Sequence, residues 1–342
     1  MKSVLRVRRP GLFTTVQDLG RPGYQHLGVP ASGALDSVSL RLTNALLGNP
    51  VGLAGLEFCY FGSELEIVGE PVRVALSCEG VITGLNSGEL KPWHTARLYP
   101  GDVLSIGGLQ GSMCGYLAVE GGFALPSVLG SLSTYTRGGF GGYQGRPLMA
   151  GDELPLSLIC AEEREEVHLT SALLEAGGPV RVTLGPDDDH FSQQAIDTLL
   201  SSEYTVAQEA DRIGLRLDGP LIAHKGPFEI ASQGTANGTI QVPGNGRPII
   251  LLADRQTTGG YTKIATVISA DLPRLGRLQP GSRIVFAAVE ARQGVQIARE
   301  QAAALNDIIA AITPVRSNRA PNAVELLGLN LVGGFVNPLD AD

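Results

Sequence analysis

The chain has little charge, few aromatic rings and very little lysine. Of its 342 residues, 18% are charged and 5% are aromatic. Acidic residues outnumber basic ones by 34 to 26, which gives a formal net charge of -8. This balance argues against a surface for nucleic acid or anionic lipid. Nearly all basic residues are arginines, whose planar forks suit carboxylates or phosphates, although a GC-rich genome would produce the same bias.

Cysteine is scarce, and no long apolar run is present. The four cysteines contain no CxxC pair, which argues against a zinc site and favours buried, reduced side chains. They are Cys59, Cys78, Cys114 and Cys160. The N-terminus has no apolar leader, and the apolar run 249–253 is far too short to span a membrane. We therefore expect a soluble, cytoplasmic protein without a metal site.

The common catalytic signatures are missing as well. The sequence has no GxxxxGK[ST], GxSxG, HExxH or complete GxGxxG, so ordinary P-loop ATPases, α/β-hydrolases and zincins fit poorly. Two weaker motifs leave alternatives open. The stretch 138–145, flanked by Arg137 and Arg146, is either a phosphate cradle or a glycine-rich loop between domains. The run 187–190 is either a metal site or an acidic turn before a helix.

The sequence does show the pattern of short strands separated by turns. The 45 glycines and 21 prolines punctuate most of the sequence, and β-type runs lie between them. Helical periodicity is confined to residues 35–47, 193–200 and 289–312. We expect a mainly β protein with a few helices. The charged stretch 160–167 is the best linker candidate, and it predicts two domains, 1–165 and 166–342.

The first candidate site segment runs from residue 14 to residue 36. Its glycines permit tight bends, which would bring six polar side chains close together. These candidate substrate-binding residues are Gln17, Asp18, Arg21, Tyr24, His26 and Asp36.

The second candidate segment, DRQTTGGYTK, follows an apolar strand, and polar groups at a strand exit are a common place for a site. Its side chains could bind a small amide or carboxylate and polarise its carbonyl group; alternatively, they only satisfy turn backbone. The candidate catalytic residues are Asp254, Arg255, Gln256, Thr257, Thr258 and Lys263. Gly259 and Gly260 would let a ligand approach the backbone, and Tyr261 completes the candidate binding residues. We expect the two segments to meet in space.

Four stretches together resemble one known family in order and spacing. They are TTVQDLGRPGYQHLGVPASGALD, GGFGGYQGRPLMAGDELPL, DRIGLRLDGP and GTIQVPGNGRPIILLADRQTTGGYTKIATVISADLPRL. The sequence is identified as a member of the family of the 5-oxoprolinase C component, otherwise the biotin-dependent carboxyltransferase or allophanate-hydrolase-subunit-2-like family. The resemblance covers about residues 1–336. One departure is Thr262, which stands where the family pattern has proline.

The resemblance implies two tandem cyclophilin-like β barrels facing each other over a cleft. It also implies an ATP-dependent 5-oxoprolinase complex, which opens 5-oxo-L-proline to L-glutamate. The implied partners are a small cyclophilin-like subunit (the B component) and a third subunit (the A component), and the complex binds ATP with Mg.

Two other activities exist in the same family. One is a biotin-dependent carboxyltransferase acting on urea or a similar amide; this chain has no biotin-carboxylase segment and no Met-Lys biotinylation motif, so a separate carrier would have to supply biotin. The other is a non-catalytic regulator that binds the inhibitor of a sensor kinase, as KipA does.

Overall fold

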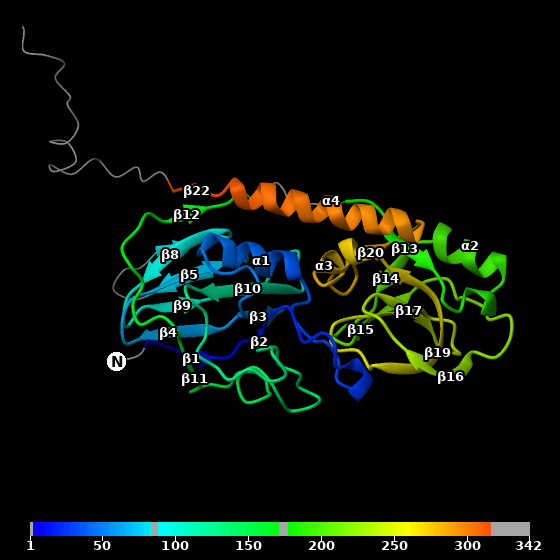
Figure 1. Ribbon diagram of the computed structural model, residues 1–342, viewed down its shortest axis with the longest axis horizontal. Coiled ribbons are helices and arrows are strands. Elements are labelled where there is room, and N and C mark those ends of the chain that lie inside the picture. The colour runs from blue at the N-terminus through cyan, green and yellow to red at the C-terminus, as the bar shows by residue number, and fades with distance from the viewer. Residues whose placement is uncertain (1–2, 79, 84–87, 171–176, 316–342) are drawn as a thin grey trace, which may run out of the picture.

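The computed structural model describes residues 3–78, 80–83, 88–170 and 177–315. Figure 1 shows two strand-rich halves side by side, with one long helix lying along both. Within the described residues the α-helices are α1 (Ser37–Leu46), α2 (Gln193–Ser201), α3 (Leu272–Leu275) and α4 (Ala291–Ala310). Three of them confirm the helices predicted from periodicity, and α3 is too short to produce a periodic signal.

The N-terminal half contains two antiparallel sheets packed face to face. The six-stranded sheet has the order β11 (Glu153–Pro155), β1 (Val4–Arg9), β4 (Glu64–Val68), β9 (Val103–Ser105), β6 (Gly80–Thr83), β7 (Gly88–Leu90). The seven-stranded sheet has the order β2 (Phe13–Gln17), β3 (Gly55–Cys59), β10 (Cys114–Val119), β5 (Val72–Leu76), β8 (His94–Leu98), β12 (Val167–His168), β22 (Thr313–Pro314). Their inner faces supply one aliphatic core, which includes Leu5, Leu56, Leu65 and Val74.

The C-terminal half is a single, nearly closed sheet. Its order is β20 (Arg283–Ile284), β14 (Tyr204–Val206), β15 (Gly214–Asp218), β18 (Ile249–Leu251), β17 (Thr239–Val242), β19 (Thr258–Val267), β13 (Val180–Leu184), β21 (Phe286–Ala288), with β16 (Glu229–Gly234) added to β19. Because β20 and β21 follow each other in the chain but stand at opposite ends of this order, the sheet curls into a barrel. The expected mainly β fold is confirmed.

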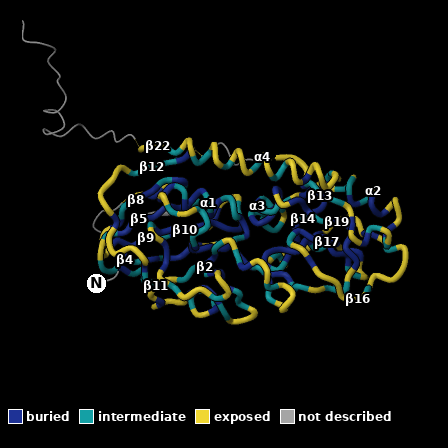
Figure 2. The backbone as a smooth tube through the Cα atoms, viewed as in Figure 1, coloured by how far each residue is buried: buried dark blue, intermediate teal, exposed yellow. Residues whose placement is uncertain are grey.

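The two halves are joined by buried apolar residues. Leu35, Leu40 and Tyr116 of the N-terminal half belong to the core cluster of the C-terminal barrel. The apolar face of α4 packs on a smaller cluster that includes Leu42 and Trp93. Figure 2 shows the dark buried backbone continuing between the halves beneath the mostly exposed α4. The relative position of the halves is therefore fixed by hydrophobic packing.

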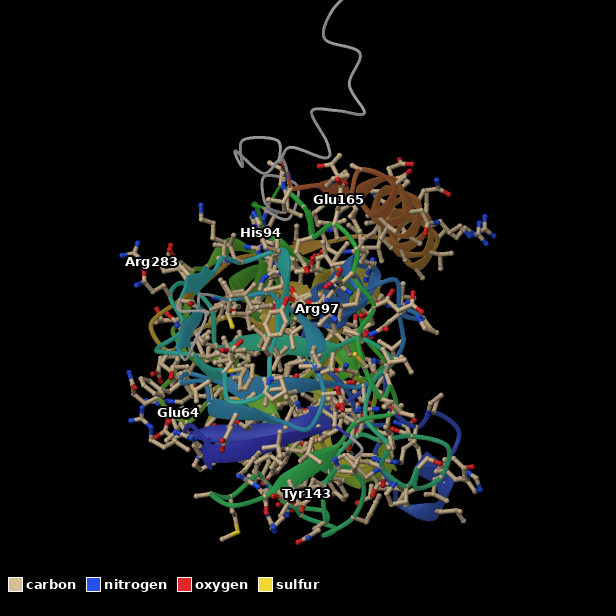
Figure 3. All side chains as sticks on the ribbon, turned by 90° about the vertical axis from the view of Figure 1, so that its left-hand side faces the viewer. Glu64, His94, Arg97, Tyr143, Glu165 and Arg283 are labelled. Carbon is tan, nitrogen blue, oxygen red and sulfur yellow. The ribbon has the colours of Figure 1, made fainter. Side chains whose placement is uncertain are left out.

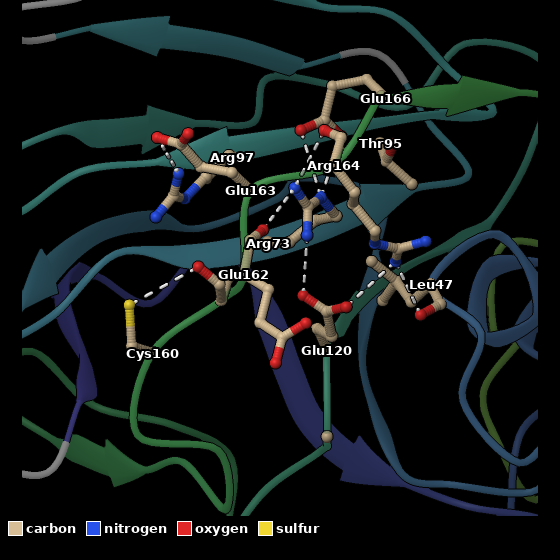
Figure 4. Close-up of polar contacts among 12 residues, drawn as sticks. Leu47, Arg73, Thr95, Arg97, Glu120, Cys160, Glu162, Glu163, Arg164 and Glu166 are labelled. Atoms are coloured by element: carbon tan, nitrogen blue, oxygen red, sulfur yellow. Dashed lines mark hydrogen bonds and ion pairs between the residues drawn. The ribbon is translucent and has the colours of Figure 1, made fainter. Parts of the chain in front are cut away.

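The predicted linker 160–167 is held firmly against the N-terminal half. The fully buried side chain of Arg73 on β5 pairs with Glu120 and Glu166 at 3.0 and 3.1 Å and donates to the backbone carbonyl of Glu162 at 3.0 Å. Arg164 pairs with Glu120 at 3.0 Å. Figure 4 shows these contacts, which we call the Arg73 clamp. Beyond the predicted boundary at residue 165, β12 still pairs with β8 of the first half.

Figure 3 views the molecule from the end formed by the N-terminal half. In Figure 3, His94 and Glu165 lie toward α4, whereas Tyr143 lies at the opposite side. Within the residues that the structure describes, no helix is both long and apolar enough to cross a bilayer.

Candidate functional site

A buried charge network joins the two halves. Arg212, which precedes β15, pairs with Asp254 at 2.8 Å and with Glu57 on β3, and it donates to the carbonyl of Gly33 at 2.7 Å. All three charged side chains are almost completely buried. Burial alone would lower the pKa of Arg212, but the charges of Asp254 and Glu57 outweigh it and raise that pKa well above its ordinary value. Arg212 is therefore a permanent cation that fixes Asp254.

A pocket of about 380 Å³ opens beside this network. Arg212 and Asp254 line it together with Arg137, which is exposed and makes no hydrogen bond or ion pair among the described residues. Its remaining wall is mainly apolar and comes from both halves: Leu12, Phe13, Cys59, Met113, Ala210 and Ile213. Apolar walls around a few convergent polar groups are typical of small-molecule sites.

Tyr60 lines the same pocket in a strained conformation. Its φ of 62° lies in the left-handed region, which is unfavourable for a bulky side chain. The backbone is held there because Tyr60 donates to Met113 at 2.8 Å and accepts from Leu109 at 2.8 Å. Burial raises the pKa of the Tyr60 phenol, with smaller contributions from Cys59 and Asp211. These hydrogen bonds hold Tyr60 in its unfavourable conformation at the pocket wall.

A second group of polar residues lies in the C-terminal barrel, next to Asp254. We call it the glutamine cluster; it consists of Thr235, Gln241, Arg255, Gln256 and Gly259. Gln256 donates to the Gln241 amide oxygen at 3.1 Å. Arg255 is 4% exposed, yet its donors reach only the carbonyl of Thr235, at 3.3 and 3.4 Å. Burial lowers the pKa of Arg255. No carboxylate of the described residues pairs with this guanidinium.

Lys263 differs from Arg255 because its charge is already matched. Its Nζ donates to Asp187 at 3.0 Å and to Gln233 at 3.1 Å. The neighbouring Thr262, which replaces the family's proline, donates its backbone N–H to Phe228 at 3.3 Å. A proline has no N–H, so the hydrogen bond to Phe228 depends on the departure from the family pattern.

The first predicted segment is bent as its glycines suggested. Gly20, Gly23, Gly28 and Gly33 all have positive φ angles, between 79° and 99°. Asp18 accepts from Ser131 and from the backbone N–H of Leu132, both at 2.6 Å. Asp18 therefore anchors this segment to the loop that follows residue 128.

Asp36 has a similar anchoring position. It caps α1 by accepting from Val38 and Ser39 at 3.1 Å each, and it pairs with Arg277 at 2.7 Å. Its oxygens are occupied by these contacts, and the side chain is fully buried. The structure thus places Asp36 where it positions a helix and joins the halves.

Arg21 is buried but incompletely satisfied. Its guanidinium donates to Ser133, lies 5.1 Å from the ring centroid of Phe140, and leaves Nη1 without a hydrogen bond. Burial lowers the pKa of Arg21, while the charges of Asp18 and Asp254 act in the opposite direction. The charge of Arg21 therefore interacts electrostatically with the charge of Asp254.

The other residues of the first segment are dispersed. Gln17 is buried and donates to Thr15 and Thr134 at 3.0 and 3.2 Å. Tyr24 is half-buried and directly precedes the turn Gln25–Leu27. His26 lies within this turn and is exposed. The two predicted segments do meet, because Arg212 binds both Gly33 and Asp254.

The rest of the second segment forms the start of β19. Thr257 is half-buried, whereas Thr258 and Tyr261 are exposed. A Cβ atom at Gly259 would lie 2.5 Å from the Gln241 amide nitrogen, and one at Gly260 would lie 3.1 Å from the carbonyl of Ile230. A side chain at either position would therefore crowd a neighbour, and at Gly259 the Gln241 amide would have to move.

The two ambiguous motifs now have locations. Arg146 pairs with Asp152 at 2.7 Å, whereas Arg137 faces the pocket between the halves. Asp188–His190 forms a short 3-10 turn before α2. Among the described residues, no group of three potential ligands is arranged to hold a metal ion.

Sequence reasoning missed Glu57, Arg212 and Gln241 as site residues. Each has a recognisable signal: Glu57 is the one charged residue of the fully buried strand GLEFC, and Gln241 is a long polar side chain in the fully buried strand TIQV. Arg212 is the second residue of DRIGLRLDGP, one of the stretches on which the family resemblance rests. A polar residue in a fully buried strand requires a partner, and that requirement could have identified both strand residues.

Comparisons with known proteins agree with this architecture. A family model described as a carboxyltransferase domain, subdomains A and B, matches residues 27–288. The chain is 35% identical to the C component of 5-oxoprolinase from Escherichia coli, over 88% of this chain and 98% of that protein. It is 33% identical to a putative urea carboxylase of Emericella nidulans, over 91% of this chain and 27% of that protein.

A solved structure shows the same fold. The Kluyveromyces lactis urea carboxylase structure matches 90% of this chain and 29% of its own, with 30% identity and a TM-score of 0.82. The chain therefore spans less than a third of that protein.

Proposed function

This chain belongs to the carboxyltransferase family of subdomains A and B, and from that premise we propose that it is the C component of an ATP-dependent 5-oxoprolinase. The complex would open 5-oxo-L-proline to L-glutamate, a hydrolysis of a cyclic amide. The observation that carries the proposal is the similarity to a 5-oxoprolinase C component over 98% of its length. The similarity to the putative urea carboxylase covers only 27% of that larger protein.

The geometry offers groups that suit the two ends of 5-oxoproline. Arg255 is a buried cation without a carboxylate partner among the described residues, and a guanidinium binds a carboxylate through two parallel hydrogen bonds. Thr257 and Thr258 would donate to the oxygen that becomes negative when the lactam carbonyl is attacked. Asp254 is held by Arg212 at 2.8 Å and would orient the neighbouring Arg255. The pocket of about 380 Å³ beside Arg212 would admit the substrate from the side of Arg137.

ATP is proposed as a substrate of the complex, together with Mg. The pocket between the halves does not fit a magnesium triphosphate. Of its two basic lining residues, Arg212 is already paired with two carboxylates, and Arg137 alone is unpaired. We therefore derive no step of ATP chemistry on this chain and assign ATP binding to the complex, whose other proposed members are the small cyclophilin-like component and the third component.

A second candidate is a carboxyltransferase that moves the carboxylate of carboxybiotin to urea or a similar amide. The TM-score of 0.82 to a urea carboxylase structure over 90% of the chain favours it. Urea and 5-oxoproline both present a carbonyl flanked by nitrogen, so the same donors would serve either reaction.

Reconstitution would test the proposal. We expect the purified chain alone to release no glutamate from 5-oxoproline, and the chain mixed with its two partner components to release glutamate only when ATP is present. Size-exclusion chromatography should show a hetero-oligomer with the small component. Turnover by the single chain, or a reconstituted complex that carboxylates urea and leaves 5-oxoproline intact, would contradict the proposal.

A further inference from the structure

Two histidines of the N-terminal half stand opposite each other on neighbouring strands, and neither lines the pocket of the candidate site. His94 on β8 and His168 on β12 are direct Cα partners in the antiparallel pairing of these strands. Residues in this relation point to the same face of a sheet, with Cβ atoms about 4.5–5.5 Å apart. Their rings are stacked, with centroids 5.1 Å apart and an angle of 16° between the ring planes. The fold therefore holds two imidazoles side by side that lie far apart in the sequence.

A hydrogen bond determines which ring nitrogen of His94 is available to a ligand. The Nδ1 atom of His94 lies 2.9 Å from the carbonyl oxygen of Pro92. Because a carbonyl oxygen only accepts, Nδ1 carries the proton, and Nε2 of the neutral ring keeps a free lone pair. A histidine that binds a metal ion through one ring nitrogen commonly donates the other N–H to a backbone carbonyl or a carboxylate. His94 already has this arrangement.

His168 has an adjustable partner. Its Nε2 lies 3.4 Å from the hydroxyl group of Thr313 on β22, and a hydroxyl rotates to suit its partner. Both histidines are half-buried and Thr313 is exposed, so ions in solution can reach the pair. No third side chain completes the set, because the described residues include no group of three possible metal ligands. Water would fill the remaining coordination positions.

We propose that His94 and His168 form a two-histidine site for a divalent transition-metal ion of the Cu²⁺, Ni²⁺ and Zn²⁺ class, which imidazole nitrogens suit. Two nitrogens that share such an ion are at most about 4 Å apart, since each lies about 2.0–2.1 Å from the metal. The stacked rings can reach this separation by rotating about their Cβ–Cγ bonds, a torsion with a broad energy minimum. The inference does not depend on the proposed function.

A bound ion would strengthen one connection in the fold. β12 follows the charged stretch 160–167 as the chain leaves the N-terminal half, and β22, the last described strand, pairs with β12. An ion held by β8 and β12 would therefore fix this pairing at its edge. Because the unfolded chain does not hold the two imidazoles together, binding would also stabilise the folded state.

Metal titration of the full chain tests the site. Calorimetry should show one Zn²⁺ ion per chain, and Cu²⁺ should bind more tightly than Zn²⁺ or Ni²⁺. The electron paramagnetic resonance spectrum of the Cu²⁺ form should show coupling to two imidazole nitrogens. In His94→Gln or His168→Gln the affinity should fall by at least about 10-fold, because a single imidazole binds without the gain from a tethered second ligand.

Two variants control for binding elsewhere on the surface. His26→Gln removes an exposed histidine of the turn Gln25–Leu27, and Cys160→Ser removes the exposed thiol. Both should keep the wild-type affinity for Zn²⁺. Saturating Zn²⁺ should raise the melting temperature of the wild-type chain and of these two controls, and it should leave the melting temperatures of His94→Gln and His168→Gln unchanged.

A further measurement needs no variant, so it remains decisive if a histidine substitution prevents folding. Zn²⁺ should protect His94 and His168 of the wild-type chain from modification by diethyl pyrocarbonate, located by peptide mass spectrometry, while His26 stays reactive. Absence of binding by the wild-type chain, an unchanged affinity in both histidine variants, loss of binding in Cys160→Ser, or equal modification of His94 and His168 with and without Zn²⁺ would overturn the inference.

Discussion

Two buried arginines in this molecule have opposite surroundings. Arg73, in the N-terminal half, is surrounded by two carboxylates and by backbone carbonyls of the segment that leaves that half. Arg255, in the C-terminal barrel, is almost equally buried but reaches one backbone carbonyl, through long hydrogen bonds. Both are cations removed from water, and only the first is neutralised by its neighbours.

Under the proposed function, the difference separates a structural charge from a ligand-binding one. A buried ion is unfavourable unless charges or hydrogen bonds compensate for its lost hydration. At Arg73 the protein supplies that compensation, and in doing so it fixes the charged segment 160–167. At Arg255 the compensation is missing within the described residues, and under the proposed function the carboxylate of the substrate would supply it. Sequence patterns do not distinguish the two, because both arginines follow apolar strands or lie within them.

The largest expected effect on stability is at the clamp. Arg73→Met would leave Glu120 and Glu166 without their buried partner, and we expect the free energy of unfolding to fall by about 3–5 kcal/mol. Chemical denaturation measures this loss. Arg97→Met is the matched control, because the Arg97–Glu163 pair has an 89% exposed carboxylate and should contribute at most about 1 kcal/mol. Equal losses in the two variants would contradict the clamp.

The matching substitution in the C-terminal barrel is Arg255→Met, and its expected effect is on activity. We expect turnover of the reconstituted complex to fall by about 100-fold or more, because the carboxylate of the substrate loses its cation. The free energy of unfolding should stay unchanged or rise, since an uncompensated buried charge is removed. Arg216→Met, an exposed arginine of β15, is the control for turnover. Normal specific activity with a lowered melting temperature would show that Arg255 is structural.

Asp36 tests whether a predicted site residue can be purely structural. Asp36→Ala removes the cap of α1 and the partner of Arg277, and we expect a loss of roughly 1–2 kcal/mol in unfolding free energy. Specific activity of the folded complex should remain near normal. A large loss of activity at unchanged stability would return Asp36 to the substrate-binding group.

The smallest effect concerns thiol ionisation. Burial raises the pKa of Cys59 to about 12, with Glu57 adding to the shift, whereas Cys160 is exposed. Alkylation followed by mass spectrometry should label Cys160 first, and raising the pH from 8 to 10 should not make Cys59 of the folded chain reactive. Because the unfolded thiol ionises at about pH 8.5, Cys59 also makes stability fall as pH rises from there toward 12.

Much of the fold could be predicted because its signals are local. The periodic runs predicted helices within one or two residues of α1, α2 and α4, and the positive φ angles of Gly20 and Gly33 confirm the bends. The contacts of the charged stretch 160–167 could not be predicted, because they depend on Arg73, about 90 residues earlier. Charge patterning shows that a segment is polar and does not show what it binds.

The contact between the two candidate segments was predictable for a similar reason. DRQTTGGYTK was recognisable as a polar strand exit, and its contact with the first segment was expected. Arg212 makes that contact, yet it belongs to neither segment, and its partners Glu57 and Gly33 lie in the other half. Arg255 has no carboxylate partner among the described residues, whereas Lys263 pairs with Asp187. This difference depends on the closure of the barrel, so it could not be predicted from the sequence.

The path of the chain after α4 has a consequence for engineering. From the C-terminal barrel the chain runs back along both halves and ends its described course in β22, which pairs with β12 of the first half. The two halves are thus held by α4, β22 and the pairing of Arg212 with Glu57 in addition to the peptide connection. Two separate polypeptides, one ending at residue 170 and the other starting at residue 177, should therefore reassemble when co-expressed, which makes this fold a candidate for fragment complementation.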